Sequence, residues 1–188
     1  MGQCYPCLDD RLIAFIGAQK VFFVATAPLA TDGHVNLSPK GYDSLAVIDE
    51  RTVAYADLGG SGIETHAHVR ENGRITLMFC AFEGPARIVR LYGRGEAVSF
   101  DDPGFEAAMT AFPHIDRARG VITVRIERVA DSCGWGVPLF GFQGEREQLR
   151  RWVQARPLEE WAQHRREANA RSIDGLPGLS QAVGLEDR

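Results

Sequence analysis

The sequence predicts a mainly β protein, in which six strands form a barrel and helices flank it. Six short segments are rich in β-branched and aromatic residues, and each is bounded by Gly, Pro, Asp or Asn. Segments with helical apolar spacing lie before, between and after these strand candidates. Because six strands fall within one small domain, we expect the sheet to close into a barrel.

The size and composition of the chain fit a single domain, which we expect to span residues 1–188, with a barrel core at 20–130 and C-terminal helices at 145–171. Of the 188 residues, 45% are hydrophobic, which is ample for one packed core. The formal net charge of -4 gives no positive field that would attract nucleic acid. No apolar run has the length of a membrane span, and the first residues lack the pattern of a secretory signal, so we expect a cytoplasmic protein.

The strands are predicted at regular intervals along the chain. The apolar run Val21–Ala27 and the segment His34–Ser38 are joined by turn-forming residues at 30–33, which indicates a hairpin. The other four predicted strands are Thr52–Ala56, Arg74–Phe82, Arg87–Val98 and Gly120–Val129.

Helices are predicted around these strands. Asp9 and Asp10 precede an apolar helical spacing at residues 12–16, which predicts a short opening helix. A predicted helix at 62–72 ends at Gly73, because glycine favours the left-handed conformation found beyond a helix end. The remaining predicted helices are 102–112, with Asp101 or Asp102 as its cap, and the charged stretches 145–155 and 158–171, expected outside the barrel or against a partner. Residues 181–188 are expected to be frayed.

A polar face is predicted on the segment 34–41. In a strand, Asn36, Ser38 and Lys40 point to the same side, so an amide, a hydroxyl and an ammonium are aimed together. This triplet can bind an anion or the polar edge of a ring. Pro39 removes a ladder donor, so we expect the strand to end there, at a rim where ligands bind. The alternative is the solvated face of an edge strand.

A glycine-rich loop at 56–62 leaves a predicted strand and enters a predicted helix. Its glycines allow successive N–H groups to turn toward one anion, Ser61 adds a hydroxyl, and the helix start adds positive partial charge. A phosphate would fit, although ordinary turn and cap chemistry has the same composition. The loop matches neither G-x-G-x-x-G nor the Walker A motif, so a mononucleotide is favoured over ATP.

The other chemistry-bearing residues indicate no metal or hydrolase site. Cys4 and Cys7 form a C-x-x-C, which we interpret as part of a partly ordered terminus rather than as a redox or zinc motif. The five histidines form no H-x-x-x-H, and His66 and His68, two residues apart, would face different sides of a helix. Trp135, in the loop after the last strand, would either contact a flat ligand or simply be packed.

Three runs of the sequence, in this order, resemble one family. They are FFVATAPLATDGHVNLSPKG, TVAYADLGGSGIETHAHVRENGRITLMFCAFEG and RIVRLYGRGEAV, and the endings SCGWGVP and SIDGLPGL are similar to one branch of it. The resemblance covers residues 8–180 and is to the pyridoxamine 5'-phosphate oxidase-related family of FMN-binding split barrels. It implies a six-stranded split barrel with flanking helices, and a homodimer with FMN at the subunit interface.

The resemblance also implies which strand meets the flavin. By position, the strand whose polar face contacts the isoalloxazine ring and the ribityl chain corresponds to Asn36, Leu37, Ser38, Pro39 and Lys40.

Two further regions are implied as cofactor contacts. The end of the next ligand-contacting strand corresponds to Ala56 and Asp57, and the loop and helix start that hold the phosphate correspond to Ser61, Gly62 and Thr65. The long strand that in the family lends a polar side chain from the partner subunit carries Arg87 and Arg90.

Two departures from the family limit what is carried over. The true oxidases have a basic pair in the phosphate loop, whereas this chain has Gly62, Glu64 and Thr65. An acidic Glu64 beside a phosphate is costly unless its side chain points away or pairs with an arginine. The oxidases also end in an arginine- and histidine-bearing substrate segment, whereas this chain ends GLPGLSQAVGLEDR. Pyridoxamine phosphate is therefore not expected as the substrate.

These observations lead to one functional hypothesis and two alternatives. The leading hypothesis is an FMN-dependent oxidoreductase that acts on an unidentified small molecule. Lys40 is the candidate for tuning the flavin, since an ammonium near the N1/C2=O edge would stabilise the anion of the reduced ring. The alternatives are a split barrel that binds the deazaflavin F420 or haem, and a flavin-binding sensor or carrier without turnover.

Overall fold

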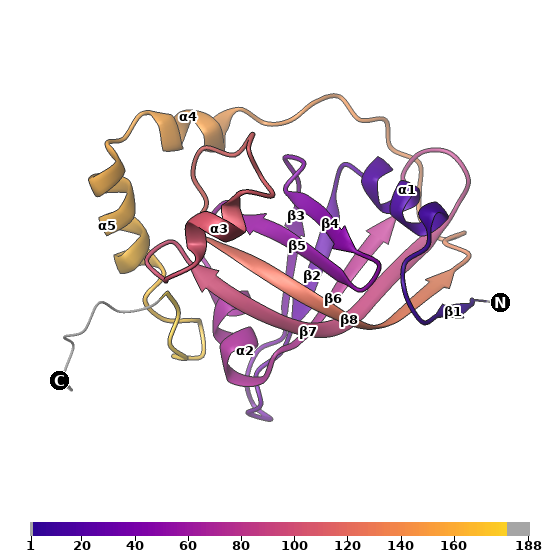
Figure 1. Cartoon of the computed structure of the whole chain (residues 1–188), viewed down its shortest axis with the longest axis horizontal. Coiled ribbons are helices and arrows are strands. Elements are labelled where there is room, and N and C mark those ends of the chain that lie inside the picture. The colour runs from indigo at the N-terminus through magenta and orange to yellow at the C-terminus, as the bar shows by residue number, and fades with distance from the viewer. Residues whose placement is uncertain (1, 180–188) are drawn as a thin grey trace.

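A curled antiparallel sheet with helices around it forms the structure, a computed structural model in which residues 2–179 are described (Figure 1). The strands are β1 (Cys4–Tyr5), β2 (Phe22–Thr26), β3 (Asn36–Lys40), β4 (Leu45–Asp49), β5 (Thr52–Asp57), β6 (Arg74–Cys80), β7 (Ile88–Ser99) and β8 (Gly120–Ser132). The helices are α1 (Asp10–Ala18), α2 (Glu64–Asn72), α3 (Phe105–Met109), α4 (Gln148–Gln154) and α5 (Leu158–Ala168). The predicted mainly β fold with flanking helices is confirmed.

The sheet is split along one line rather than closed. Its strands follow the order β3-β2-β6-β7-β8-β5-β4, with β1 added to β8. Within residues 2–179, no backbone pairing joins β3 to β4, although these strands are consecutive in sequence. Tyr42 and Asp43 between them have positive φ angles of 61° and 54°, so the chain turns away instead of forming a hairpin. The closed barrel expected from the strand count is thus corrected to the split barrel that the family resemblance implied.

All six predicted strands are present, as β2, β3, β5, β6, β7 and β8. The sequence did not reveal two further strands, β1 and β4. Strand β1 lies at the terminus that we interpreted as partly ordered. That interpretation was wrong, because the Gln3 N–H and the Tyr5 hydroxyl both donate to the Asp131 carboxylate, at 2.8 and 3.0 Å, and fix β1 beside β8. The predicted frayed end, 181–188, lies outside the described residues.

The inner face of the sheet carries the main hydrophobic core. Phe22 and Val24 on β2 are buried, and Phe22 stacks on Phe79 of β6 with 5.7 Å between ring centroids. Helix α1 adds Leu12 and Ile16 to the same core. Burial of each large apolar side chain contributes about 1.5–3 kcal/mol, so the alternation along the strands fixes which face of each strand points inward.

The predicted helices are present, with one error at a helix start. Asp9 caps α1 by accepting the Leu12 N–H at 2.8 Å, and α2 ends at Gly73, whose φ is 71°. Helix α3 is shorter than predicted and starts after Gly104 rather than at an aspartate cap. The Asp102 carboxylate instead accepts the Ser99 N–H at 2.7 Å, which makes it unavailable to α3.

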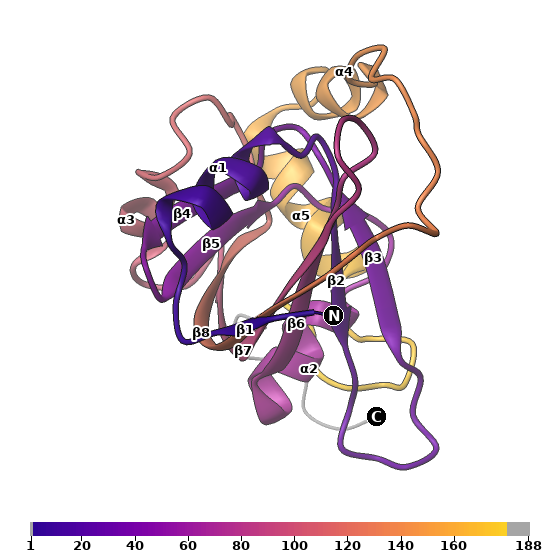
Figure 2. The same cartoon turned by 90° about the vertical axis from the view of Figure 1, so that its right-hand side faces the viewer.

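The C-terminal helices lie on the outside of the barrel, at the side away from β1 (Figures 1 and 2). Trp161 of α5 is buried against Phe100, with 5.2 Å between their ring centroids. The chain beyond α5 folds back to α2, where Arg70 donates to the carbonyl of Gly178. None of the helices in the described part of the chain has both the length and the apolar character needed to cross a membrane.

Candidate functional site

The split in the barrel is lined by polar side chains, and we call this line the seam. It consists of Asn36, Ser38 and Lys40 on β3, facing Asp57 at the end of β5 and Thr65 on α2. The predicted alternation along β3 is present, because these three β3 side chains are half-buried. The seam therefore contains polar groups from both predicted ligand-contacting segments.

The other two residues of β3 point away from the seam. Leu37 is 64% exposed and Pro39 is also exposed. Their register partners on β2, Ala25 and Phe23, lie on the outer face of the sheet, which is only half-buried. Leu37 and Pro39 thus form part of an uncovered sheet face rather than of the seam.

One end of the seam is a cluster of charged groups around Asp57. The carboxylate of Asp57 is 1% exposed and lies 3.0 Å from Lys40 Nζ and 2.9 Å from Arg119 Nη2. Arg119 Nε also donates to the same carboxylate at 3.0 Å, and His66 Nε2 lies 3.3 Å from it. Since Arg119 is 4% exposed and His66 is 0% exposed, this end of the seam is shielded from water.

The surroundings fix the protonation of this cluster. Burial opposes ionisation of Asp57, but the Arg119 guanidinium and the Lys40 ammonium hold the pKa of its carboxyl well below the usual value. Burial lowers the pKa of His66, against the opposing effect of Asp57, so its imidazole is neutral. Two cations therefore share one carboxylate, and the cluster carries excess positive charge.

The other end of the seam is held by neutral hydrogen bonds. The Asn36 amide donates to the hydroxyls of Thr65, at 3.0 Å, and Thr26, at 3.2 Å. The Ser38 hydroxyl donates to the Asn36 carbonyl oxygen at 2.9 Å. His68 Nδ1 lies 3.0 Å from the Thr26 hydroxyl, so the predicted opposite orientation of the two α2 histidines is confirmed.

The glycine loop, Gly59 to Gly62, connects β5 to α2 beside the seam. Its carbonyls point toward side chains that are distant in sequence. The Gly60 carbonyl accepts hydrogen bonds from Arg119 at 3.3 Å, Arg165 at 3.1 Å and Asn169 at 3.1 Å. Arg165 and Asn169 come from the end of α5, so the C-terminal helix holds this loop in place.

Glu64, the acidic residue of concern in this loop region, is paired with a backbone amide. Its carboxylate folds back against Gly62, and it accepts the Ile173 N–H at 3.2 Å. From the sequence, we expected Glu64 either to point away from the loop or to pair with an arginine. Neither is the case, because Glu64 remains beside the loop and its partner is a backbone N–H. The partner belongs to the segment that follows α5.

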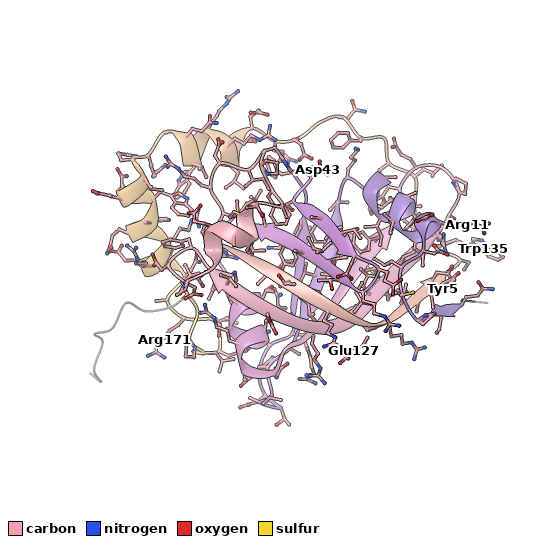
Figure 3. All side chains as sticks on the ribbon, in the orientation of Figure 1. Tyr5, Arg11, Asp43, Glu127, Trp135 and Arg171 are labelled. Atoms are coloured by element: carbon pink, nitrogen blue, oxygen red, sulfur yellow. The ribbon has the colours of Figure 1, made fainter. Side chains whose placement is uncertain are left out.

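The structure brings together most of the predicted site residues but not all of them. Those at the seam or the glycine loop are Asn36, Ser38, Lys40, Asp57, Ser61, Gly62 and Thr65. Ala56 is not among them, because alternation along β5 turns it into a separate hydrophobic cluster with Ala54 and Phe112. Arg90 lies on β7, where it donates to the Ser132 hydroxyl at 3.3 Å, and Arg87 pairs with Asp131 at 2.8 Å. Trp135 is 85% exposed and therefore not packed, and in Figure 3 it lies at the end of the molecule opposite Arg171.

Sequence reasoning missed four residues of the site. Arg119 directly precedes β8, His66 lies on α2, and Arg165 and Asn169 lie at the end of α5. Its position directly before a predicted strand was the local signal available for Arg119. No local pattern connects α5 to the glycine loop, because Arg165 and Gly60 are 105 residues apart.

Comparison with known proteins gives a consistent result. The family sequence model described as Pyridoxamine 5'-phosphate oxidase matches residues 8–133. The pyridoxamine 5'-phosphate oxidase family protein ustO of Aspergillus flavus is 37% identical over 196 residues, which cover 95% of this chain and 78% of that protein.

Solved structures support the fold. A crystal structure of HupZ from Group A Streptococcus has a TM-score of 0.52 and 24% identity, covering 65% of this chain and 91% of that chain. A variant of the same protein gives a TM-score of 0.54 and 23% identity, covering 66% of this chain and 98% of that chain. At these identities the likeness concerns the fold alone.

Proposed function

Because the chain belongs to the pyridoxamine 5'-phosphate oxidase family, we propose that it is a flavoprotein that binds FMN along the seam and the glycine loop and transfers electrons between this flavin and a small molecule. One observation carries the proposal. Asn36, on the strand that the family resemblance assigns to the ring, donates at 3.0 Å to Thr65, in the region assigned to the phosphate. The two polar segments found in the sequence therefore adjoin and can serve one ligand.

The side chains at the seam suit the ring and the ribityl chain. Asn36 and Ser38 offer an amide and a hydroxyl that can exchange their mutual hydrogen bond for a ligand's polar edge. Lys40 is 17% exposed, so its ammonium is within reach of a ligand while Asp57 holds it from behind. The excess positive charge of this cluster favours an anionic cofactor over a neutral one.

The start of α2 suits the phosphate. Ser61, Gly62 and Thr65 lie where the loop enters the helix, and a helix start carries positive partial charge. Glu64 opposes this charge, and the Ile173 N–H holds its carboxylate in place without removing the negative charge. The loop is therefore suited to a phosphate that is held by backbone groups rather than by a pair of basic side chains.

Each residue of the charged cluster then has a distinct role. The flavin supplies the redox chemistry when it is bound. Lys40 provides a positive charge beside the ring, and Asp57, which is buried and occupied by cations, holds Lys40 and Arg119 in position rather than contacting the cofactor. Neutral His66 packs behind the carboxylate without adding to the positive charge.

Lys40→Ala tests the tuning role of Lys40. Loss of the ammonium removes a charge that favours the reduced, anionic ring, so we expect weaker FMN binding or a lower reduction potential. The measurement is a spectroscopic redox titration of the loaded variant. Full flavin occupancy with an unchanged potential would remove this role from Lys40.

A homodimer with FMN at its interface is also part of the proposal. The outer face of the sheet at β3 is uncovered, since Val35 and Leu37 are 74% and 64% exposed, and such a face favours association. Arg90 would then serve the site of the other subunit, which fits its distance in the fold from this seam. Light scattering after size exclusion tests the dimer, and a monomer at micromolar concentration would argue against it.

Titration with FMN tests the proposal as a whole. We expect quenching of flavin fluorescence, a rise in melting temperature and, with bound FMN, oxidation of NADH or NADPH. Binding without turnover would leave a flavin carrier or sensor, and binding of F420 or haem in place of FMN would identify a different split-barrel protein.

A further inference from the structure

Helix α5 contributes to the proposed cofactor site although it lies outside the barrel. We propose that Arg165 and Asn169 are positioning residues that hold the glycine loop with its amide N–H groups turned outward, toward the phosphate of the flavin. This inference rests on the proposed function, because it assigns a role at the phosphate end of that site. It extends the site to a part of the chain beyond residues 8–133, the stretch that matches the family model.

The first observation is the number of donors on one carbonyl. The Gly60 oxygen accepts from Arg119, Arg165 and Asn169, all between 3.1 and 3.3 Å. Asn169 also donates to the Ser61 carbonyl at 3.4 Å, and Arg119 donates to the Gly62 carbonyl. Three successive carbonyls of the loop are therefore drawn toward buried side chains.

The direction of these carbonyls determines the direction of the neighbouring N–H groups. All peptide bonds of the described residues are trans, and in a trans peptide the C=O and N–H of one unit point in opposite directions. Fixing the carbonyls of Gly60, Ser61 and Gly62 inward thus directs the N–H groups of Ser61, Gly62 and Ile63 to the other side. Within residues 2–179 these three N–H groups donate no hydrogen bond, so they are available to an anion.

The second observation is how rigidly Arg165 is held. Its guanidinium lies over the ring of Trp152, 4.6 Å from the centroid, and close to the backbone of Gly59. A Cβ at Gly59 would lie 3.0 Å from Arg165 Cζ, and Gly59 has a φ of 91°, so glycine is needed there for two reasons. A buried guanidinium that stacks on an aromatic ring and donates to the loop has little freedom to reorient, which is what positioning of a loop requires.

The third observation is the charge balance. Lys40 and Arg119 contact the single carboxylate of Asp57, and a third cation, Arg165, shares the Gly60 carbonyl with Arg119. Arg165 and Asn169 are buried, and Arg165 Nε and Asn169 Oδ1 have no hydrogen-bond partner within the described residues. Buried positive charge in excess of its counter-charge is stabilised when an anion binds nearby.

The test compares FMN with riboflavin, which has the same ring but lacks the phosphate. For the full chain, affinities are measured by quenching of flavin fluorescence. Arg165→Met is expected to weaken FMN binding by about 10- to 100-fold, the effect of losing one charge-assisted hydrogen bond, and to leave riboflavin binding unchanged within about twofold. Asn169→Ala should act in the same direction with a smaller effect, and Arg165→Lys, which keeps the charge, should restore part of the preference for FMN.

Arg166→Met is the matched control, because it removes an arginine from the same helix without touching the loop. Arg166 donates to both oxygens of Asp101 at 2.8 Å, and the variant should bind both flavins like the wild type. Equal losses of FMN and riboflavin in Arg165→Met, or no loss of either, would overturn the positioning role. If Arg165→Met does not fold, Asn169→Ala and Arg165→Lys provide the test, again by the ratio of FMN affinity to riboflavin affinity. A wild type that binds neither flavin would instead overturn the proposed function.

Discussion

The two ends of the seam differ in the kind of interaction that closes them. At one end, Asp57 is buried among Lys40, Arg119 and His66. At the other end, the Asn36 amide donates a neutral hydrogen bond to the Thr65 hydroxyl. A buried charge cannot lose its partner without a large penalty, whereas a neutral hydrogen bond is easily exchanged for one to a ligand. The comparison indicates that the buried Asp57–Arg119 pair sets the architecture, and that the neutral end is where hydrogen bonds are exchanged for those of a ligand.

Asp57→Ala should have the largest effect on stability. It leaves the buried Arg119 and the half-buried Lys40 without their counter-charge, and we expect a loss of about 3–5 kcal/mol in the free energy of unfolding, measured by urea denaturation. The control is Asp101→Ala, which breaks the partly exposed pair with Arg166 and should lose about 1 kcal/mol or less. Equal losses in the two variants would mean that the charged end is not structural.

Thr65→Val should have a smaller effect on stability and a clearer one on binding. It removes the hydroxyl that accepts from Asn36, which should lower the free energy of unfolding by about 0.5–1.5 kcal/mol and weaken FMN binding. Thr65→Ser keeps the hydroxyl and serves as the control for both measurements. A loss as large as that of Asp57→Ala would contradict the distinction between the two ends of the seam.

Glu64→Gln should strengthen the binding of FMN. The Glu64 carboxylate lies against Gly62, so its removal takes away a negative charge beside the proposed phosphate, while the amide oxygen can still accept the Ile173 N–H. We expect a gain of up to about fivefold for FMN, corresponding to about 1 kcal/mol, and none for riboflavin. A gain for both flavins, or weaker FMN binding, would place the phosphate elsewhere.

The smallest expected effect concerns pH and the contact between the β2–β3 loop and the C-terminal segment. His34 Nδ1 lies 2.6 Å from Asp174, and this hydrogen bond raises the pKa of His34 above its usual 6.5 and lowers that of Asp174 below its usual 3.8. The contribution of His34 is complete below pH 6.5 and lost as pH rises through its raised pKa. The contribution of Asp174 is complete above pH 3.8 and lost as pH falls through its lowered pKa.

The pair should therefore stabilise the fold most between pH 3.8 and pH 6.5. His34→Gln removes the titrating group, so the difference in melting temperature between wild type and variant should be larger at about pH 5 than at about pH 9. Because the His34 side chain is 70% exposed, the difference should be small. A difference that grows with pH would contradict the pairing.

Local patterns in the sequence were sufficient for much of this structure. The alternation along β3 gave the orientation of Asn36, Ser38 and Lys40, and the glycine at position 73 gave the end of α2. The expected closure of the barrel failed because β3 and β4 do not pair, and the positive φ of Tyr42 between them is a conformation that a tyrosine does not indicate in advance.

The rest of the site depends on contacts between distant segments. His66 reaches Asp57 only because α2 packs against the end of β5, and Asn169 reaches Gly60 across 109 residues. Period-two and helical patterns describe the faces of single elements and carry no information about which elements meet. The family resemblance assigned the proposed site to β3, the end of β5 and the start of α2, and it implied no contact from α5.

The absorption spectrum of the purified full chain, with mass identification of the small molecule released on denaturation, tests the central claim most directly. A yellow protein with a flavin spectrum that releases FMN is the expected result. A colourless protein whose melting temperature does not respond to FMN would contradict the claim. So would a deazaflavin spectrum or a haem Soret band.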